Sequence, residues 1–156
     1  MHLTDARDLA VALMKRHGLD AAGWRFRFDH ARRRFGCCKF SEKAITLSRP
    51  LTLLNPSDQV RDTILHEIAH ALTPGDGHGR KWRAACVRVG ANPRRCYSDD
   101  EVVSPPRRPV PYRYGCRACG WWVDRRRVMR GRKYVCAKCR GPVVYEAKSS
   151  LNAVAG

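Results

Sequence analysis

Two histidines and the glutamate between them are the strongest sign of chemistry in this chain. The segment HEIAH at residues 66–70 places the two imidazoles about 40° apart on one face of a helix, so both can reach one metal ion. Glu67 lies one residue to the side, where a carboxylate can take a proton from a metal-activated water. An apolar stripe follows the opposite face: Val60, Ile64, Ile68 and Leu72. The pattern predicts a helix that buries one face and presents a metal site on the other.

The residues around HEIAH also bear on this prediction, because the five-residue motif occurs by chance in many proteins. Asn55 is a good N-cap, Pro56 suits the first helical position, and Thr73-Pro74-Gly75 would end the helix. Bounded in this way, the segment is predicted to be an amphipathic helix with a metal-binding face.

A catalytic zinc usually has three protein ligands, so a third is needed besides His66 and His70. His78 is favoured, since imidazole is the commoner ligand and the flanking glycines give this position backbone freedom. Asp76 is an alternative ligand, or could orient a ligand histidine. Glu101 is a more distant alternative. A solvated loop histidine is the plain alternative interpretation of His78.

Four cysteines form a second predicted metal site. Cys116 and Cys119 make one CxxC pair and Cys136 and Cys139 another, with residues 120–135 between the pairs. This spacing is typical of zinc ribbons, in which four thiolates close a tetrahedral structural site. A disulfide pairing is the alternative, and it suits the reducing cytoplasm poorly. Two zinc ions are therefore expected, one catalytic and one structural.

Aromatic and basic residues alternate between the two cysteine pairs, and the whole chain is strongly basic, with 31 Lys and Arg against 14 Asp and Glu and a net charge of +17. Aromatic rings stack on bases and guanidinium groups follow phosphates, so DNA is the predicted partner, single-stranded or irregular in form. Alternatively, the rings pack inside the protein and the arginines are only solvated. The predicted contact residues are Trp121, Trp122, Arg125, Arg126, Arg127, Arg130, Arg132, Lys133 and Tyr134.

The remaining pattern predicts an α+β protein. A helix is expected over residues 5–17, three short strands over 24–28, 34–40 and 44–48 joined by hairpin connections, and a further helix over 79–89. The expected division is a first domain at 1–97, a linker at 98–111, a ribbon at 112–145 and a flexible tail at 146–156. No signal peptide and no membrane span is recognised, so a cytoplasmic location is expected, near the nucleoid in a prokaryote.

These motifs in this order resemble the SprT-like family, which includes the Spartan proteases. The resemblance rests on ITLSRPLTLLNP, RDTILHEIAHAL, GHGRKW and the final CxxC pairs, and covers residues 9–145. It implies a small zincin-like metallopeptidase domain, with the active helix packed on a short sheet, followed by a zinc ribbon. It also implies that His66, His70 and His78 bind catalytic zinc and that Glu67 is the acid/base.

The expected function is that of a zinc-dependent endopeptidase acting on DNA-bound proteins. The resemblance to Spartan implies DNA–protein crosslink repair as its setting. An oxyanion partner is also needed, for which Tyr97 is considered. One alternative is a non-catalytic zinc-containing adaptor that binds DNA or takes part in transcription. A second alternative is a general metalloprotease whose charge only keeps it soluble.

Overall fold

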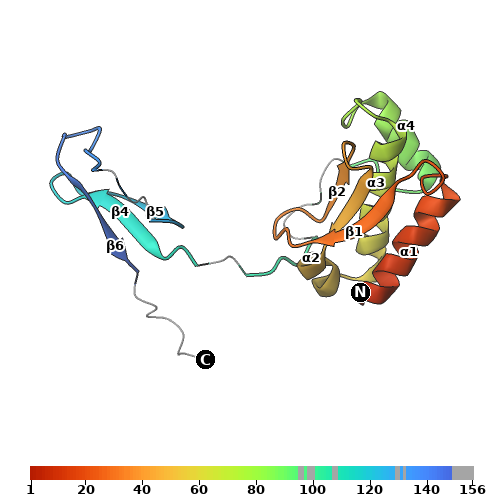
Figure 1. The fold of residues 1–156 in the computed structure, drawn as a ribbon, viewed down its shortest axis with the longest axis horizontal. Coiled ribbons are helices and arrows are strands. Elements are labelled where there is room, and N and C mark those ends of the chain that lie inside the picture. The colour runs from red at the N-terminus through yellow and green to blue at the C-terminus, as the bar shows by residue number, and fades with distance from the viewer. Residues whose placement is uncertain (95–96, 98–100, 107–108, 129–130, 132, 149–156) are drawn as a thin grey trace. The chain divides into compact units, whose positions relative to one another are not determined.

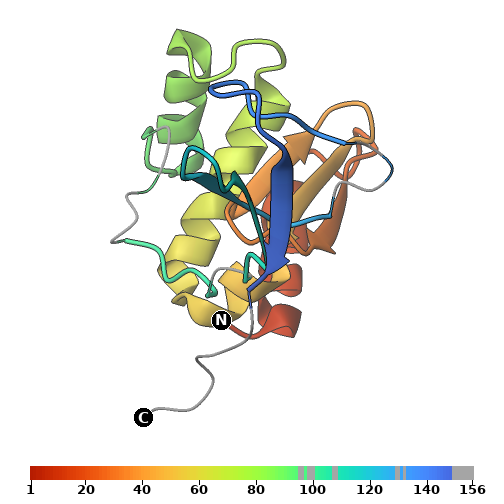
Figure 2. The ribbon, with the colours of Figure 1, turned by 90° about the vertical axis from the view of Figure 1, so that its left-hand side faces the viewer.

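The chain forms two compact units, Met1–Pro105 and Pro106–Gly156, which are described separately (Figures 1 and 2). The computed structural model describes residues 1–94, 97, 101–106, 109–128, 131 and 133–148. Both units contain strands, and the first also contains helices, so the architecture is α+β.

The first unit packs helices against a three-stranded sheet. The helices are α1 (Leu3–Arg16), α2 (Arg49–Leu54), α3 (Ser57–Leu72) and α4 (Arg80–Val89), and the strands are β1 (Arg25–Asp29), β2 (Gly36–Lys39) and β3 (Ala44–Ser48). The strand order is β1-β3-β2, so β2 lies at an edge of the sheet. The central strand β3 runs parallel to β1 and antiparallel to β2, and all five of its residues are buried.

The expected hairpin between the first two strands is wrong, because β1 and β2 both pair with β3. The segment between β1 and β2 instead crosses the end of β3, where it is hydrogen-bonded to Ser48. The Ser48 N–H donates to the Phe35 carbonyl at 2.8 Å, and the Ser48 hydroxyl donates to the Ala31 carbonyl at 2.5 Å. Asp29 starts the turn by accepting the Ala31 N–H at 2.9 Å. The second expected connection does join antiparallel neighbours, β2 and β3.

The short helix α2 was not expected from the sequence, and it changes the role of Asn55. Ser48 caps α2, with its hydroxyl oxygen accepting the Leu51 N–H at 3.2 Å. The prediction that Asn55 caps the next helix is wrong, because Pro56 occupies that position. The buried Asn55 amide instead donates to the carbonyls of Leu51 and Val103 and accepts the Val103 N–H. Asn55 thus fixes the segment that follows α4 against the end of α2.

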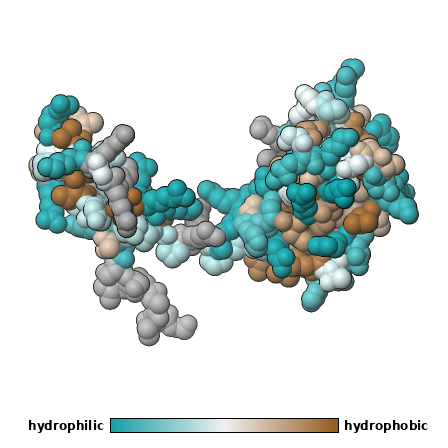
Figure 3. Space-filling model, viewed as in Figure 1, coloured by the Kyte–Doolittle hydropathy of each residue, from teal (hydrophilic) through white to brown (hydrophobic). Residues whose placement is uncertain are grey.

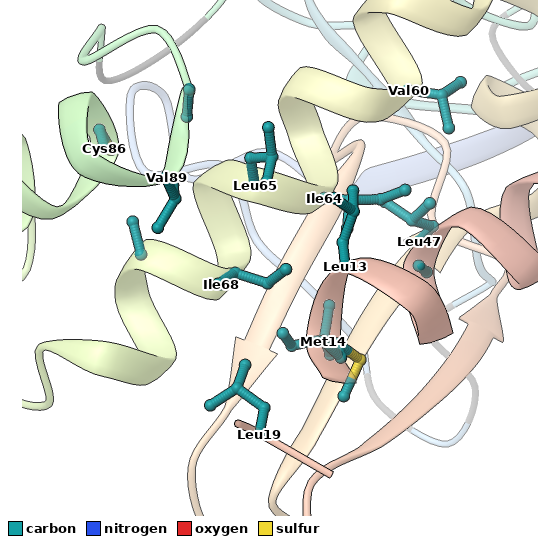
Figure 4. Packing of buried hydrophobic residues seen from close by; sticks show 14 of the residues in the cluster. Leu13, Met14, Leu19, Leu47, Val60, Ile64, Leu65, Ile68, Cys86 and Val89 are labelled. Carbon is teal, nitrogen blue, oxygen red and sulfur yellow. The ribbon is translucent and has the colours of Figure 1, made fainter. Parts of the chain in front are cut away.

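Helix α3 lies at the centre of the hydrophobic core (Figure 4). Its residues Val60, Ile64, Leu65 and Ile68 have no solvent exposure, and the helix contacts α1, the sheet and α4. Each such side chain stabilises the fold by about 1.5–3 kcal/mol relative to an exposed one. Because α3 is held on several sides, the positions of His66, Glu67 and His70 are fixed by the core.

The surface of the first unit includes an apolar area at α2. The side chains of Leu53 and Leu54 are exposed there, and Figure 3 shows hydrophobic residues where Figure 1 places α2. Among the described residues, a helix that could span a bilayer is absent.

The second unit is a small antiparallel sheet with the order β5-β4-β6. Its strands are β4 (Tyr112–Cys116), β5 (Trp121–Arg125) and β6 (Val143–Ala147). The buried side chains described in this unit are those of Tyr114, Cys116 and Cys136. So small a core stabilises a fold weakly, which is typical of domains that need a metal. Of the expected tail, residues 149–156 lie outside the described part of the chain.

Candidate metal centres and nucleic-acid interface

Three histidines of the first unit converge on one point. His66 and His70 extend from α3, and His78 comes from the loop that joins α3 to α4. The His78 Nε2 atom lies 3.2 Å from His70 Nε2 and 3.4 Å from His66 Nε2. A tetrahedral zinc with bonds of about 2.0–2.1 Å to nitrogen requires ligand atoms about 3.3 Å apart, which these distances match. Three nitrogen donors leave a fourth position for water.

Asp76 and Glu101, the alternative third ligands, are not part of this group. Among the described residues of the first unit, the side chains whose ligand atoms lie close enough to share one metal ion are His66, His70 and His78. The Asp76 carboxylate instead accepts the backbone N–H of Trp82 at 2.8 Å. A carboxylate at this position satisfies an N–H group in the first turn of α4 and suits the positive end of the helix dipole. Asp76 therefore fixes the start of α4, and with it the side chain of Trp82.

Trp82 packs against the three histidines, a contact that the sequence patterns did not predict. Its indole ring is fully buried, stacks on His70 with a centroid distance of 5.2 Å, and meets His66 and His78 edge-on at 4.8 and 4.5 Å. The helical period of α4 places Trp82 on the same face as buried Ala85 and Val89, so the sequence did hold a signal for its burial. Contact with all three imidazoles restricts their rotation and keeps the triad assembled.

Burial keeps the imidazoles of His66 and His70 in the neutral form that binds metals. The pKa of His66 falls to about 4, chiefly through burial and then through the neighbouring His70 and His78. The pKa of His70 also falls to about 4, through burial and then His78. At neutral pH both rings therefore have free lone pairs for a cation.

Glu67 is buried beside the triad, with only 7% of its surface exposed. Burial raises the pKa of its carboxyl group to about 7, although the Cys38 backbone N–H, which donates to it, and the positive charge of Arg34 both lower that pKa. A carboxyl group with a pKa near 7 can both accept and release a proton at neutral pH. Since Cys38 belongs to β2, the edge strand holds the carboxylate in place.

Gly36 makes room for Glu67 at the start of β2. A Cβ atom on Gly36 would lie 2.7 Å from the Glu67 Oε1 atom and 2.8 Å from the Thr63 Cγ2 atom. Both distances are shorter than van der Waals contact. The close packing of β2 on α3 at this point therefore requires glycine.

The triad and Glu67 open into a cleft of about 540 Å³. One wall is β2 with the loop before it, and the other is the segment after α4, including Asn92, Tyr97 and Val102. Tyr97, considered above for oxyanion stabilisation, lines the cleft, and its hydroxyl donates to Asp62 at 2.5 Å. Asp62 also accepts the Asn92 N–H at 2.7 Å, so it fastens this wall to α3.

The four cysteines of the second unit also converge. The Sγ atoms of Cys116 and Cys139 are 3.4 Å apart, and those of Cys119 and Cys136 are 3.6 Å apart. A disulfide requires about 2.05 Å, whereas tetrahedral zinc with bonds of about 2.3 Å to sulfur places its ligands about 3.8 Å apart. The backbone N–H groups of Cys139 and Lys138 lower the pKa of Cys136 to about 7. Although the Gly141 N–H lowers the pKa of Cys139, the hydrogen bonds with Cys116 and Cys119 outweigh it and raise that pKa to about 12. This group fits a closed, structural zinc site.

The two tryptophans predicted to bind nucleic acid lie on opposite faces of the second sheet. Paired residues of neighbouring strands share a face, and Trp121 pairs with Cys116 whereas Trp122 pairs with Gly115. The Trp122 ring lies over Gly115, with the Arg113 guanidinium 5.1 Å from its centre. Trp121 is 46% exposed. Of the two, only Trp121 is free to stack on a base.

Three tyrosines that were not among the predicted contacts extend the face that carries Trp121. Tyr112, Tyr114 and Tyr145 belong to the same face by register, and Tyr145 stacks on Tyr114 at 5.4 Å. Arg125 pairs with Tyr112 and adds a positive charge to this face. The side chains of Trp121, Tyr145 and Arg125 are exposed. We call these five residues the aromatic face of the ribbon.

The other predicted contact residues lie outside the sheet. Arg126, Arg127 and Lys133 are exposed, and Tyr134 is half-buried. Arg130 and Arg132 lie outside the described part of the chain. The predicted nucleic-acid contacts thus fall on different surfaces of the second unit, and among its described residues the aromatic face combines exposed rings with a cation.

Comparison with known families agrees with the motifs. A model of the SprT-like family matches residues 9–101, which include the triad and Glu67. The chain belongs to the SprT-like family. It is similar to Protein SprT of Actinobacillus succinogenes, with 32% identity over 113 residues that make up 68% of this chain and 66% of that protein. It is also similar to Protein SprT-like of Bacillus velezensis, with 30% identity over 108 residues, or 66% of this chain and 70% of that protein.

Among solved structures, this SprT-like chain is similar to the metallopeptidase zymogen jannalysin of Methanocaldococcus jannaschii. The likeness has a TM-score of 0.47 and 14% sequence identity, and it covers 62% of this chain and 85% of that one. Similarity at this level does not establish a shared activity, so the function has to be argued from the site.

Substitution of His78 by alanine should remove one metal from the protein. We expect the zinc content to fall from two ions per chain to one, because two imidazoles alone bind zinc much more weakly than three. Elemental analysis after dialysis against a weak chelator measures this. His30→Ala, at an exposed histidine far from the triad in sequence, should keep both ions. Two ions in the His78 variant would contradict the assignment.

Substitution of Gly36 by alanine should destabilise the first unit by about 1–3 kcal/mol, because the new methyl group overlaps the Glu67 carboxylate and Thr63. Urea denaturation followed by circular dichroism measures this change in the free energy of unfolding. Lys39→Ala on the same strand alters only a surface ion pair with Glu42 and should change stability by less than about 0.5 kcal/mol. Equal stability of the two variants would show that Glu67 is not confined by β2.

Proposed function

We propose that this protein is a zinc-dependent endopeptidase that acts on proteins bound to nucleic acid. One observation carries the proposal: the buried carboxyl group of Glu67 lies beside three converging imidazoles in an open cleft. A structural metal site needs neither an open coordination position nor a neighbouring proton acceptor. The family to which the chain belongs is consistent with this reading of the site.

The residues of the chain divide the chemistry between them. His66, His70 and His78 would hold the metal in their neutral forms. Zinc, when bound, would act as a Lewis acid and lower the pKa of a coordinated water toward about 7. Glu67 would accept a proton from the attacking water and deliver it to the departing amine, while the Cys38 N–H keeps its carboxylate oriented.

An extended peptide is the substrate that best suits the cleft. The edge strand β2 contributes Gly36, Cys37 and Cys38 to the lining, and only one of its sides is paired within the sheet. An edge strand can bind an extended peptide through backbone hydrogen bonds, which places a peptide bond without reading its side chains. Cleavage of varied sequences is therefore expected.

Nucleic acid is the partner proposed for the second unit. The net charge of +17 favours a polyanion, and the aromatic face of the ribbon offers exposed Trp121 and Tyr145 beside Arg125. Such surfaces bind single strands by stacking. Attachment to DNA would raise the local concentration of the enzyme near bound or crosslinked proteins, and proximity would then provide the selectivity.

Replacement of Glu67 by glutamine should abolish proteolysis and leave the metal in place. We expect the cleavage rate of a DNA-binding protein to fall by about 10²–10⁴-fold, because the amide cannot accept the proton. The assay uses the zinc-loaded full chain with and without single-stranded DNA, and elemental analysis confirms equal zinc content in both proteins. Cleavage by the unsubstituted protein should depend on the DNA.

Each other outcome of this assay points to a different function. Cleavage that needs Glu67 but not DNA would identify a general metalloprotease and leave the ribbon a structural role. Absence of cleavage with both zinc ions bound would favour the non-catalytic adaptor. Equal cleavage by the Glu67→Gln variant would show that the activity does not come from this site.

A further inference from the structure

Helix α4 has two faces of opposite character. Its buried face consists of Trp82, Ala85, Cys86 and Val89. Every other residue of the helix is exposed, and four of these six residues are cations: Arg80, Lys81, Arg83 and Arg88. At 100° per residue the exposed positions occupy one continuous arc of the helix, so the four cations share its outer face. We call these four residues the α4 basic face.

No acidic group neutralises the α4 basic face in the structure as described. The helix contains no Asp or Glu. The ion pairs found among the described residues use other cations, such as Arg34 with Asp29 and Arg94 with Glu101. Asp76, which precedes the helix, directs its carboxylate to the Trp82 N–H. The four charges of the face therefore remain available to a ligand.

A neighbouring element adds to this positive surface. The pKa of His17, at the end of α1, is lowered by burial and then by the charges of Arg16 and Arg88. The charge of Arg88, near the end of α4, therefore acts on His17 at the end of α1. Arg16 and Arg88 are both exposed and add to the positive charge of the first unit.

The chemistry of the face suits a regular row of phosphates. Ten residues of helix span about 15 Å, and over that length a nucleic-acid duplex carries about nine negative charges. Three of the four cations are arginines, which bind phosphate oxygens through two parallel hydrogen bonds. The only aromatic residue of α4, Trp82, is buried, so the face has no ring to stack on an unpaired base. Phosphate contacts alone favour a duplex over a single strand.

We propose that the α4 basic face binds the phosphate backbone of a nucleic-acid duplex. This surface belongs to the first unit and differs in chemistry from the aromatic face of the ribbon, which is proposed to stack on single strands. The proposal concerns binding, and it stands whether or not the histidine site cleaves peptides.

Binding at the α4 basic face would place the duplex close to the histidine triad. The same helix presents Trp82 to the three histidines on one side and the four cations on the other. A duplex bound along α4 would therefore lie within one helix diameter, about 10 Å, of the tryptophan that supports the triad. A protein attached to that duplex would be close to the cleft.

The salt dependence of duplex binding tests the proposal directly. In the full chain, the double substitution Arg83→Gln and Arg88→Gln removes two charges from the face and keeps good helix formers. The control, Arg7→Gln and Arg25→Gln, removes two exposed charges from α1 and β1, at positions outside the cleft lining and the ion pairs described. Affinity for a blunt-ended DNA duplex is measured by fluorescence anisotropy over a series of salt concentrations.

The slope of log K against log salt should become less negative by about 1.8 in the α4 variant, because each phosphate contact contributes about 0.9. The control pair should leave the slope unchanged, and zinc content and circular dichroism should match in all three proteins. Equal slopes for both variants would overturn the proposal, since the effect would then reflect net charge. The proposal would also be overturned if the α4 variant still bound the duplex and a Trp121→Ala variant did not. That result would assign duplex binding to the ribbon.

Discussion

The burial of Glu67 is the constraint on which the candidate site depends. A carboxyl group shielded from water is costly unless it is hydrogen-bonded or protonated, and here both conditions are partly met. The Cys38 N–H donates to it, and burial raises its pKa to about 7. That hydrogen bond requires β2 to lie directly against α3. In the strand order β1-β3-β2, the edge strand β2 is the one that takes this position. Gly36 then allows the close approach.

The histidine triad depends on a second set of contacts made on the other side. Two of its members are fixed by α3, whose opposite face is buried in the core. The third comes from a loop, and the loop is held because Asp76 anchors the start of α4. Trp82, placed by that anchor, contacts all three rings. The core and these contacts thus set the geometry of the donors, and helix α4 offers its charged face to the solvent.

Local sequence patterns predicted the parts of this protein that local physics determines. The helical period located α3 with His66, Glu67 and His70, and the CxxC spacing located the four cysteines that the second unit brings together. The sheet order could not be read in the same way, because the parallel pairing of β1 with β3 is a long-range contact. Helix α2 was not predicted because its sequence, RPLTLL, is short and apolar. The contact of Trp82 with the histidines was not predicted because it joins residues of two different helices and a loop. The opposite orientations of Trp121 and Trp122 follow from strand alternation and were predictable.

Crystallography with anomalous scattering at the zinc absorption edge would show whether the triad holds a zinc ion with one position open to water. We expect an anomalous peak bonded to the Nε2 atoms of His66, His70 and His78 at about 2.0–2.1 Å, with a water as fourth ligand and Glu67 within hydrogen-bonding reach of that water. A second peak should lie among the four cysteines. A peak at the cysteines alone, or a triad whose fourth position is filled by a protein side chain, would contradict this expectation.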